Sequence, residues 1–129
     1  MKVEKGFDLE TNYLVLADGP GAKRIEVGPD FWQTIHTRDD LAGRLVGIFR
    51  YEADWDSWEM HPDGDEIVVL LSGAVDLVLD AAGGERTVEL RDRAAAVVPR
   101  EVWHTANVIA PGEALHITRG AGTAHRARS

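Results

Sequence analysis

Short apolar runs recur along this chain and are separated by clusters of Gly, Pro, Asp and Ser. In the middle of the chain, Val75, Leu77 and Leu79 share one face of a period-two pattern and Asp76 and Asp80 share the other, which indicates a strand with one buried face. The run at 67–71 is apolar on both faces, as expected for a strand that is covered on both sides. About nine strand candidates follow from this pattern: residues 12–16, 23–27, 44–51, 67–71, 74–79, 86–90, 94–98, 104–109 and 114–118.

The turn residues between these runs come at the intervals expected of an all-β sandwich or barrel. The best helix candidate is residues 30–41, with Asp30 as its N-cap, although the segment is short and weakly amphipathic. We therefore expect an all-β fold with at most one or two short helices.

Composition excludes several classes of function. The chain has 129 residues, which suits one domain, and it has no cysteine, so disulfides, thiolate zinc sites and cysteine nucleophiles are excluded. The net charge is -8, which disfavours nucleic acid and anionic membranes as partners, because both need a basic surface. No apolar run resembles a signal peptide or a membrane span, and we expect a soluble cytoplasmic protein.

Candidate chemistry is concentrated in WEMHPDGDE, residues 58–66. If WEMH is a strand, Glu59 and His61 lie on one face of it. Glu66 then shares a face with apolar residues of the next strand, where a carboxylate is costly unless it is paired or bound to a metal. His104 opens a later strand. Without cysteine, a metal site in this chain depends on histidine and carboxylate ligands.

Two spaced motifs resemble those of the cupin superfamily. The first cupin motif is His-x-His, three or four residues, Glu, six residues, Gly; here Glu59-Met60-His61 precedes Glu66 by four residues, and Gly73 follows after six more. The second is Pro-x-Gly-x-x-His followed closely by Asn, and here it reads PREVWHTAN, residues 99–107. Glu59 stands where the first histidine is usual, and Glu101 stands where glycine is usual.

This resemblance implies a double-stranded β-helix, the cupin jelly-roll barrel, which is often a homodimer. It also implies one divalent metal ion inside the barrel, held by Glu59, His61, Glu66 and His104, with Fe, Mn, Zn and Ni as candidates. Glu59 has a second candidate role as a general base. We predict one cupin domain over residues 1–129, with the barrel core at about 43–119, N-terminal strands within 12–42 and a loosely ordered tail at 120–129.

The remaining residues leave alternatives open. Trp58 and Trp103 flank the motifs and are predicted to line the pocket, against the alternative of core or rim packing. His116 lies in a strand and His125 in the tail, and neither has a spacing partner.

Three functions fit this pattern. The first is a metal-dependent enzyme, of dioxygenase or isomerase type, acting on a small organic substrate. The second is a non-catalytic cupin that binds or senses a small molecule. The third is a metal-free carbohydrate epimerase, which ranks last because neither motif carries a cluster of Arg or Lys for a sugar phosphate.

Overall fold

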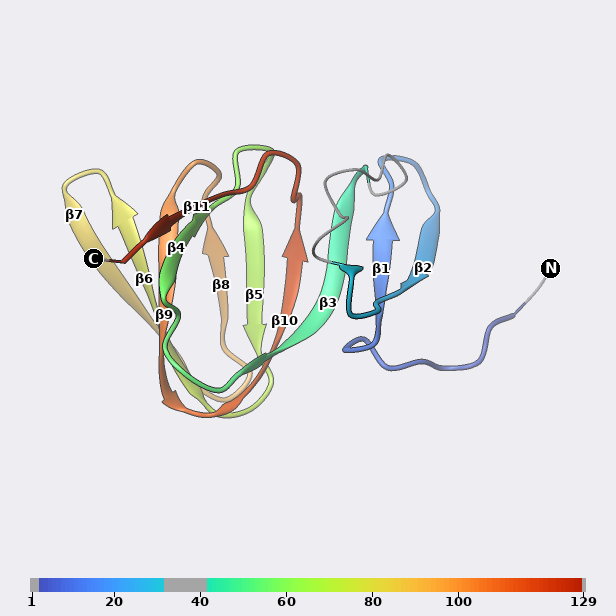
Figure 1. Ribbon diagram of the computed structural model, residues 1–129, viewed down its shortest axis with the longest axis horizontal. Coiled ribbons are helices and arrows are strands. Elements are labelled where there is room, and N and C mark those ends of the chain that lie inside the picture. The colour runs from blue at the N-terminus through green and yellow to red at the C-terminus, as the bar shows by residue number, and fades with distance from the viewer. Residues whose placement is uncertain (1–2, 32–41, 129) are drawn as a thin grey trace.

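Two antiparallel sheets make up the protein, as its computed structural model shows (Figure 1). The structure describes residues 3–31 and 42–128, and within these it contains eleven strands. The larger sheet has the strand order β2-β1-β3-β10-β5-β8, and the smaller has the order β11-β4-β9-β6-β7. The strands are β1 (Asn12–Leu16), β2 (Ala22–Glu26), β3 (Arg44–Tyr51), β4 (Ser57–Met60), β5 (Glu66–Leu70), β6 (Ala74–Ala81), β7 (Gly84–Leu90), β8 (Ala95–Val98), β9 (Trp103–Ala110), β10 (Gly112–Thr118) and β11 (Ala124–Ala127).

The predicted all-β jelly-roll fold is confirmed, and alternation along the strands explains how it forms. On β6, Val75, Leu77 and Leu79 are buried and face the core, as their period of two predicts. On β5, Glu66 shares the buried face with Val68 and Leu70. These inward positions bring one carboxylate into an otherwise apolar interior.

The main core fills the space between the two sheets. It combines inward residues of both sheets, among them Tyr51, Leu70, Leu77 and Leu90, each at most 2% exposed. A smaller cluster, which includes Tyr13 and contacts the main core through Phe49, packs under β1 and β2. Figure 1 shows β1 and β2 at the opposite end of the molecule from β6 and β7. The N-terminal strands thus extend the larger sheet and leave the barrel end to the two motifs.

Two tight turns explain motif positions. Gly73 has φ 82°, and a Cβ there would lie 2.5 Å from the Ala110 carbonyl oxygen, so the turn after β5 requires glycine. Glu101, where the second motif usually has glycine, has φ 68° in the same left-handed region. Its N–H donates to the His61 carbonyl oxygen at 3.0 Å. The turn before His104 therefore has a glycine-like conformation despite the glutamate.

Two further expectations from the sequence concern the tail at 120–129 and the helix at 30–41. The tail was expected to be loosely ordered, but residues 124–127 form β11, which pairs with β4 in the register His125↔Glu59. Apart from its first two residues, the predicted helix at 30–41 lies outside the described residues. Within the described ranges, no helix is long and apolar enough to cross a membrane.

Candidate metal centre

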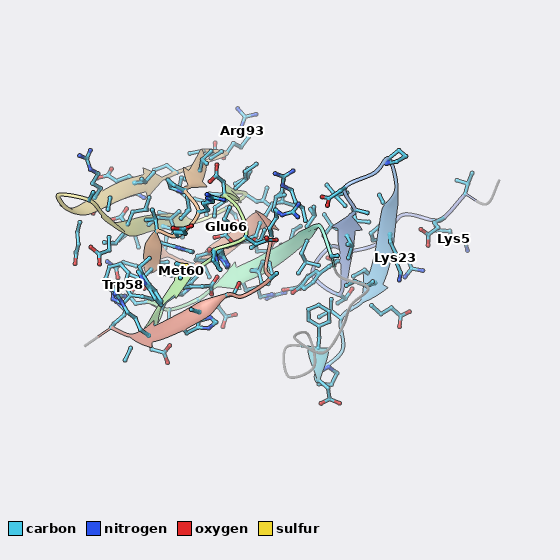
Figure 2. The ribbon with its side chains drawn as sticks, turned by 90° about the horizontal axis from the view of Figure 1, so that it is seen from above. Lys5, Lys23, Trp58, Met60, Glu66 and Arg93 are labelled. Carbon is cyan, nitrogen blue, oxygen red and sulfur yellow. The ribbon has the colours of Figure 1, made fainter. Side chains whose placement is uncertain are left out.

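The four predicted ligands meet inside the barrel. Glu59 lies on β4, His61 follows that strand directly, Glu66 begins β5, and His104 lies on β9 opposite Glu59 in the strand register. One ligand atom from each residue lies within 4.8 Å of all the others. Figure 2 shows Glu66 among the strands of the barrel end. Residues 45 positions apart in sequence, Glu59 and His104, are thus brought together by sheet pairing.

The cluster is closed on most sides. The side chains of His104, Glu66 and His61 are 0%, 2% and 6% exposed, whereas that of Glu59 is 25% exposed. Solvent therefore reaches the cluster from the side of Glu59. A molecule that binds to the cluster from outside would have to approach from that side.

The donor atoms converge but do not satisfy one another. His61 Nε2 lies 2.8 Å from Glu59 Oε1, and His104 Nε2 lies 3.1 Å from Glu66 Oε1. These contacts are short enough for hydrogen bonds but are poorly directed, so His61 Nε2, Glu66 Oε1 and His104 Nε2 have no well-aligned partner among the described residues. Because a buried polar atom without a partner is costly, this arrangement fits a cation at the point where the atoms converge.

Hydrogen bonds on the far side of each imidazole direct Nε2 toward that point. His104 Nδ1 lies 3.3 Å from the Val102 carbonyl oxygen, which only accepts, so the proton is on Nδ1. His61 Nδ1 lies 2.8 Å from Thr123 Oγ1, whose own proton goes to the Gly120 carbonyl oxygen at 2.7 Å. Thr123 Oγ1 therefore accepts a hydrogen bond from the protonated Nδ1 of His61. In the neutral form of either histidine, Nε2 carries the lone pair that a metal needs.

The carboxylates are held in a similar way. Glu66 Oε2 accepts from Thr118 Oγ1 at 2.6 Å and from His116 Nδ1 at 3.2 Å. The hydroxyl of Tyr51 lies 2.6 Å from His116 Nε2. Glu59 Oε2 accepts from His125 Nε2 at 3.1 Å. In each glutamate, Oε2 accepts hydrogen bonds from the surrounding protein, and Oε1 lies close to a ligand imidazole. Glu66 Oε2 also lies 3.3 Å from His61 Nε2.

The charges of the cluster are strongly coupled. Burial lowers the pKa of His61, but the short contacts with Glu59 and Glu66 and the charges of these carboxylates outweigh burial and raise this pKa to about 9. Burial raises the pKa of the Glu66 carboxyl, yet its contacts with His104, His116 and His61 hold that pKa well below its usual range. The pKa of Glu59 is also lowered: burial opposes the shift, and the short contact with His61 favours it most. Without a metal, His61 carries the compensating positive charge.

The pocket-lining role of Trp58 and Trp103 stays a prediction, and the positions of the two residues on their strands do not support it. Each directly precedes an inward residue on its strand, so its ring lies on the opposite face of the sheet. There the Arg126 guanidinium lies 5.5 Å from the Trp58 ring centroid and 4.6 Å from that of Trp103. The tryptophan beside the centre is Trp55, whose ring centroid lies 6.1 Å from that of His104 and 5.6 Å from that of Tyr51.

Several residues around the centre were missed by sequence reasoning. His116 and His125 had no spacing partner in sequence, and their partners Glu66 and Glu59 lie 50 and 66 positions away. For His116, the usable indication was alternation, since it is two residues from Thr118 on the same face of β10. No comparable indication existed for His125, because its position depends on β11 pairing with β4.

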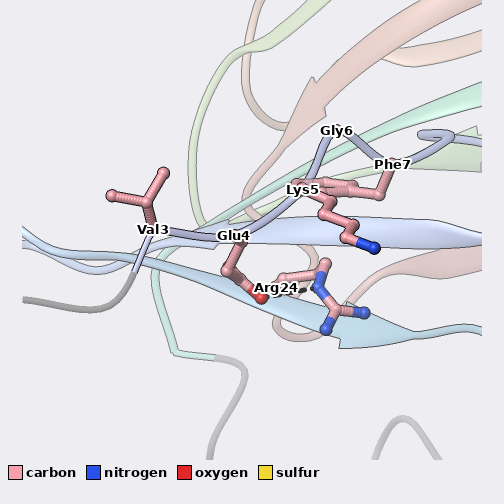
Figure 3. Close-up of a pocket in the computed structure, with 6 residues that line it drawn as sticks. All are labelled: Val3, Glu4, Lys5, Gly6, Phe7 and Arg24. Carbon is pink, nitrogen blue, oxygen red and sulfur yellow. Dashed lines mark hydrogen bonds and ion pairs between the residues drawn. The ribbon is translucent and has the colours of Figure 1, made fainter.

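An open surface hollow lies apart from this cluster (Figure 3). Arg24 there forms an ion pair with Glu4 at 2.9 Å and lies over the Phe7 ring at 5.5 Å. Arg24 and Glu4 are thus paired with each other, and we assign no chemistry to the hollow. The residues that line it are Val3, Glu4, Lys5, Gly6, Phe7 and Arg24.

Comparison with solved structures identifies the fold. A cupin-2 domain protein from Shewanella frigidimarina superposes with a TM-score of 0.51 at 17% identity, over 59% of this chain and 70% of that one. A variant of Bacillus subtilis oxalate decarboxylase gives 0.54 at 19% identity, and an oxalate oxidase gives 0.52 at 15%. The chain therefore has the fold of the cupin superfamily.

These similarities concern the fold alone. The matched region covers 69% of this chain but only 25% of the oxalate decarboxylase, and 63% of this chain but 45% of the oxalate oxidase. No family model and no curated protein sequence matches this chain.

Proposed function

We propose that this protein binds one divalent metal ion through Glu59, His61, Glu66 and His104 and uses it to bind a small organic molecule. The observation that carries the proposal is the convergence of three buried donor atoms that lack a directed hydrogen-bond partner among the described residues. Two imidazoles and two carboxylates suit Fe(II), Mn(II), Zn(II) and Ni(II). The second carboxylate favours the ions that prefer oxygen, and the Mn(II) centres of Bacillus subtilis oxalate decarboxylase support testing manganese first.

The reaction types that fit best are those of a metal-dependent dioxygenase or isomerase. A bound ion would supply Lewis acidity or redox chemistry at the open side of the centre. The residues of the chain would hold and orient the reactants: His61 and His104 present fixed Nε2 atoms, and Trp55 provides an aromatic wall beside His104. The lowered pKa of Glu59 makes it a weak base at neutral pH and supports its role as a ligand.

Charge balance narrows the class of ligand. Within the described residues, the hydrogen-bond and ion-pair partners of Glu59 and Glu66 are histidine and threonine side chains. A divalent ion with two carboxylates and neutral imidazoles makes a centre with no net charge. Such a centre binds a dianion less well than a centre with one carboxylate. We therefore propose a neutral or singly charged chelating molecule in preference to oxalate.

A non-catalytic binding or sensing protein is the second candidate. It is favoured by one observation, the glutamate at position 59 where metal-binding cupins usually have histidine. A sensor would be stabilised by its ligand without turnover. A catalytic Fe(II) centre would consume oxygen in the presence of a substrate, so measured oxygen consumption distinguishes the two.

Elemental analysis of the untagged protein tests the metal centre directly. We expect close to one Fe, Mn, Zn or Ni per chain, and loss of that metal in His61→Ala and His104→Ala with the β-sheet circular dichroism retained. Arg126→Ala, on the opposite sheet face, is the matched control and should keep its metal. Full metal content in both histidine variants would contradict the ligand assignment. A wild-type protein that neither contains nor is stabilised by these four metals would contradict the function.

A further inference from the structure

Two histidines that are not metal ligands contact the centre in the same way. His116 binds Oε2 of Glu66, and His125 binds Oε2 of Glu59. In both glutamates the other oxygen, Oε1, lies near the Nε2 atom of a ligand histidine, at 3.1 Å and 2.8 Å respectively. Glu66 Oε2 also lies 3.3 Å from His61 Nε2, so at Glu66 the hydrogen bonds to Oε2, rather than its direction, separate the two oxygens. The two histidine contacts come from different sheets, since His116 is on β10 and His125 is on β11.

At Glu66 the contact with His116 is buried, and it belongs to a chain of hydrogen bonds that ends at Tyr51. A carboxylate only accepts, so the proton in the contact with His116 must be on Nδ1. His116 Nε2 is then free to accept the hydroxyl proton of Tyr51, which is 2% exposed. Thr118 donates to the same carboxylate oxygen at 2.6 Å. Two donors thus occupy Oε2, while the equally buried Oε1 has no aligned partner among the described residues.

At Glu59 the arrangement is exposed. The His125 side chain is 57% exposed, and that of Glu59 is 25% exposed. Backbone pairing between β11 and β4 sets His125 directly opposite Glu59, so the contact follows from the strand register. This side is also the one from which solvent reaches the cluster.

We propose that His116 and His125 are positioning residues that restrict Glu66 and Glu59 to one inward oxygen each. A carboxylate binds a metal through one oxygen or through both, and a hydrogen bond on the second oxygen favours the single-oxygen mode. Keeping both glutamates in that mode leaves room on the ion for a chelating molecule or for two waters. The inference rests on the proposed function, because it specifies how the same four ligands bind their ion.

The test counts the exchangeable waters on Mn(II) bound to the purified protein, by electron–nuclear double resonance in ¹⁷O-labelled water. Removing the positioning contact in His116→Leu or His125→Ala should free Oε2 to bind the ion, so each variant should lose one exchangeable water relative to wild type. His116→Leu should also change the Mn(II) dissociation constant by about 10- to 100-fold, the range typical of such supporting contacts. The conservative His125→Gln should retain the wild-type water count.

Two further variants separate positioning from folding. Arg126→Ala neighbours His125 on β11 but faces the outer side, so it should leave the water count and Mn(II) affinity unchanged. Thr118→Val removes the second donor on Glu66 Oε2 with little change in shape, and it reports on the same oxygen if His116→Leu does not fold. An unchanged water count in His125→Ala and in Thr118→Val would overturn the proposal.

Failure of the proposed function gives a different result. If the wild-type protein binds none of the four metals, the proposed metal centre is wrong. The contact between His116 and Glu66 can then still be tested in the metal-free protein, through the tautomer of His116. Nitrogen-15 NMR should find the proton of His116 on Nδ1. A neutral His116 with its proton on Nε2 would overturn the contact with Glu66 regardless of metal.

Discussion

Metal binding should release a proton from His61, and its pH dependence tests the electrostatics of the centre. Without metal, Glu59 and Glu66 raise the pKa of His61 to about 9, so the imidazole is charged at pH 7. A metal needs the lone pair of Nε2 and must displace that proton. Because pH 7 lies two pH units below this pKa, proton competition should weaken the apparent affinity about 100-fold relative to its value at high pH.

The stability of the metal-free protein should change with pH in the opposite direction to its metal affinity. A pKa raised above the ordinary 6.5 means that the charged His61 stabilises the fold at pH below 6.5, and that this contribution is lost as the pH rises through about 9. The metal-free protein should therefore become less stable between pH 7 and pH 9. Over the same interval, the increase in melting temperature caused by metal should grow, because the metal no longer competes with a proton.

Isothermal titration calorimetry measures the released proton directly. Titrating Mn(II) at pH 7 into the protein in two buffers with different ionisation enthalpies should give close to one proton released per ion. Glu59 and Glu66 contribute none at this pH, since their lowered pKa values keep them ionised. Arg126→Ala is the control and should release the same proton. No released proton, or an affinity that is constant from pH 7 to pH 9, would refute the assigned coupling between His61 and the two glutamates.

Four other substitutions or measurements follow from the structure. Glu101→Gly removes a non-glycine residue from φ 68°, and chemical denaturation should show stabilisation of up to about 1 kcal/mol, whereas a loss of stability would contradict the account of this turn. Leu77→Ala leaves a cavity at a fully buried core position and should cost about 2–5 kcal/mol in the free energy of unfolding, with a cost below 1 kcal/mol contradicting its placement. Glu59→His should raise the preference for Ni(II) over Mn(II) and strengthen oxalate binding to the loaded protein, and unchanged competition titrations would place Glu59 outside the ligand set. The homodimer stays a prediction: Leu71 and Val97 are 42% and 60% exposed, and if they lie in the interface, Val97→Lys should increase the monomer fraction in sedimentation experiments, which an unchanged fraction would contradict.

The sequence predicts the strands because they depend on local patterns, and it predicts the ligands through the resemblance to two cupin motifs. Alternation at Val75, Leu77 and Leu79 indicates the inward face of β6. The structure brings the four motif residues together, as the resemblance implies. The orientation of Trp58 and Trp103 was available from the same alternation, since each neighbours an inward ligand on its strand. Their aromatic character suggested a pocket, but the strand period decides which face a side chain occupies.

The contacts that support the ligands depend on long-range pairing and could not be predicted. Thr123 and His125 lie in a segment of small and basic residues that lacks a strand pattern. Their ordering comes from the free edge of β4, which accepts β11 as a partner. His116 was identifiable as a core residue but not as a partner of Glu66, because the pairing of β10 with β5 sets that contact.

The position of β11 in chain order has a consequence for folding. The contacts of Thr123 with His61 and of His125 with Glu59 span 62 and 66 residues. His125 lies on β11, the last of the described strands to be synthesised, and Thr123 directly precedes that strand. Contacts of such long range form late, because closing the intervening loop is entropically costly. A nascent chain that has folded the rest of its barrel thus has all four ligands, but His61 and Glu59 still lack the contacts that orient them. Metal capture would then be coupled to the pairing of β11 with β4, and the ion would be retained tightly only after these two strands have paired.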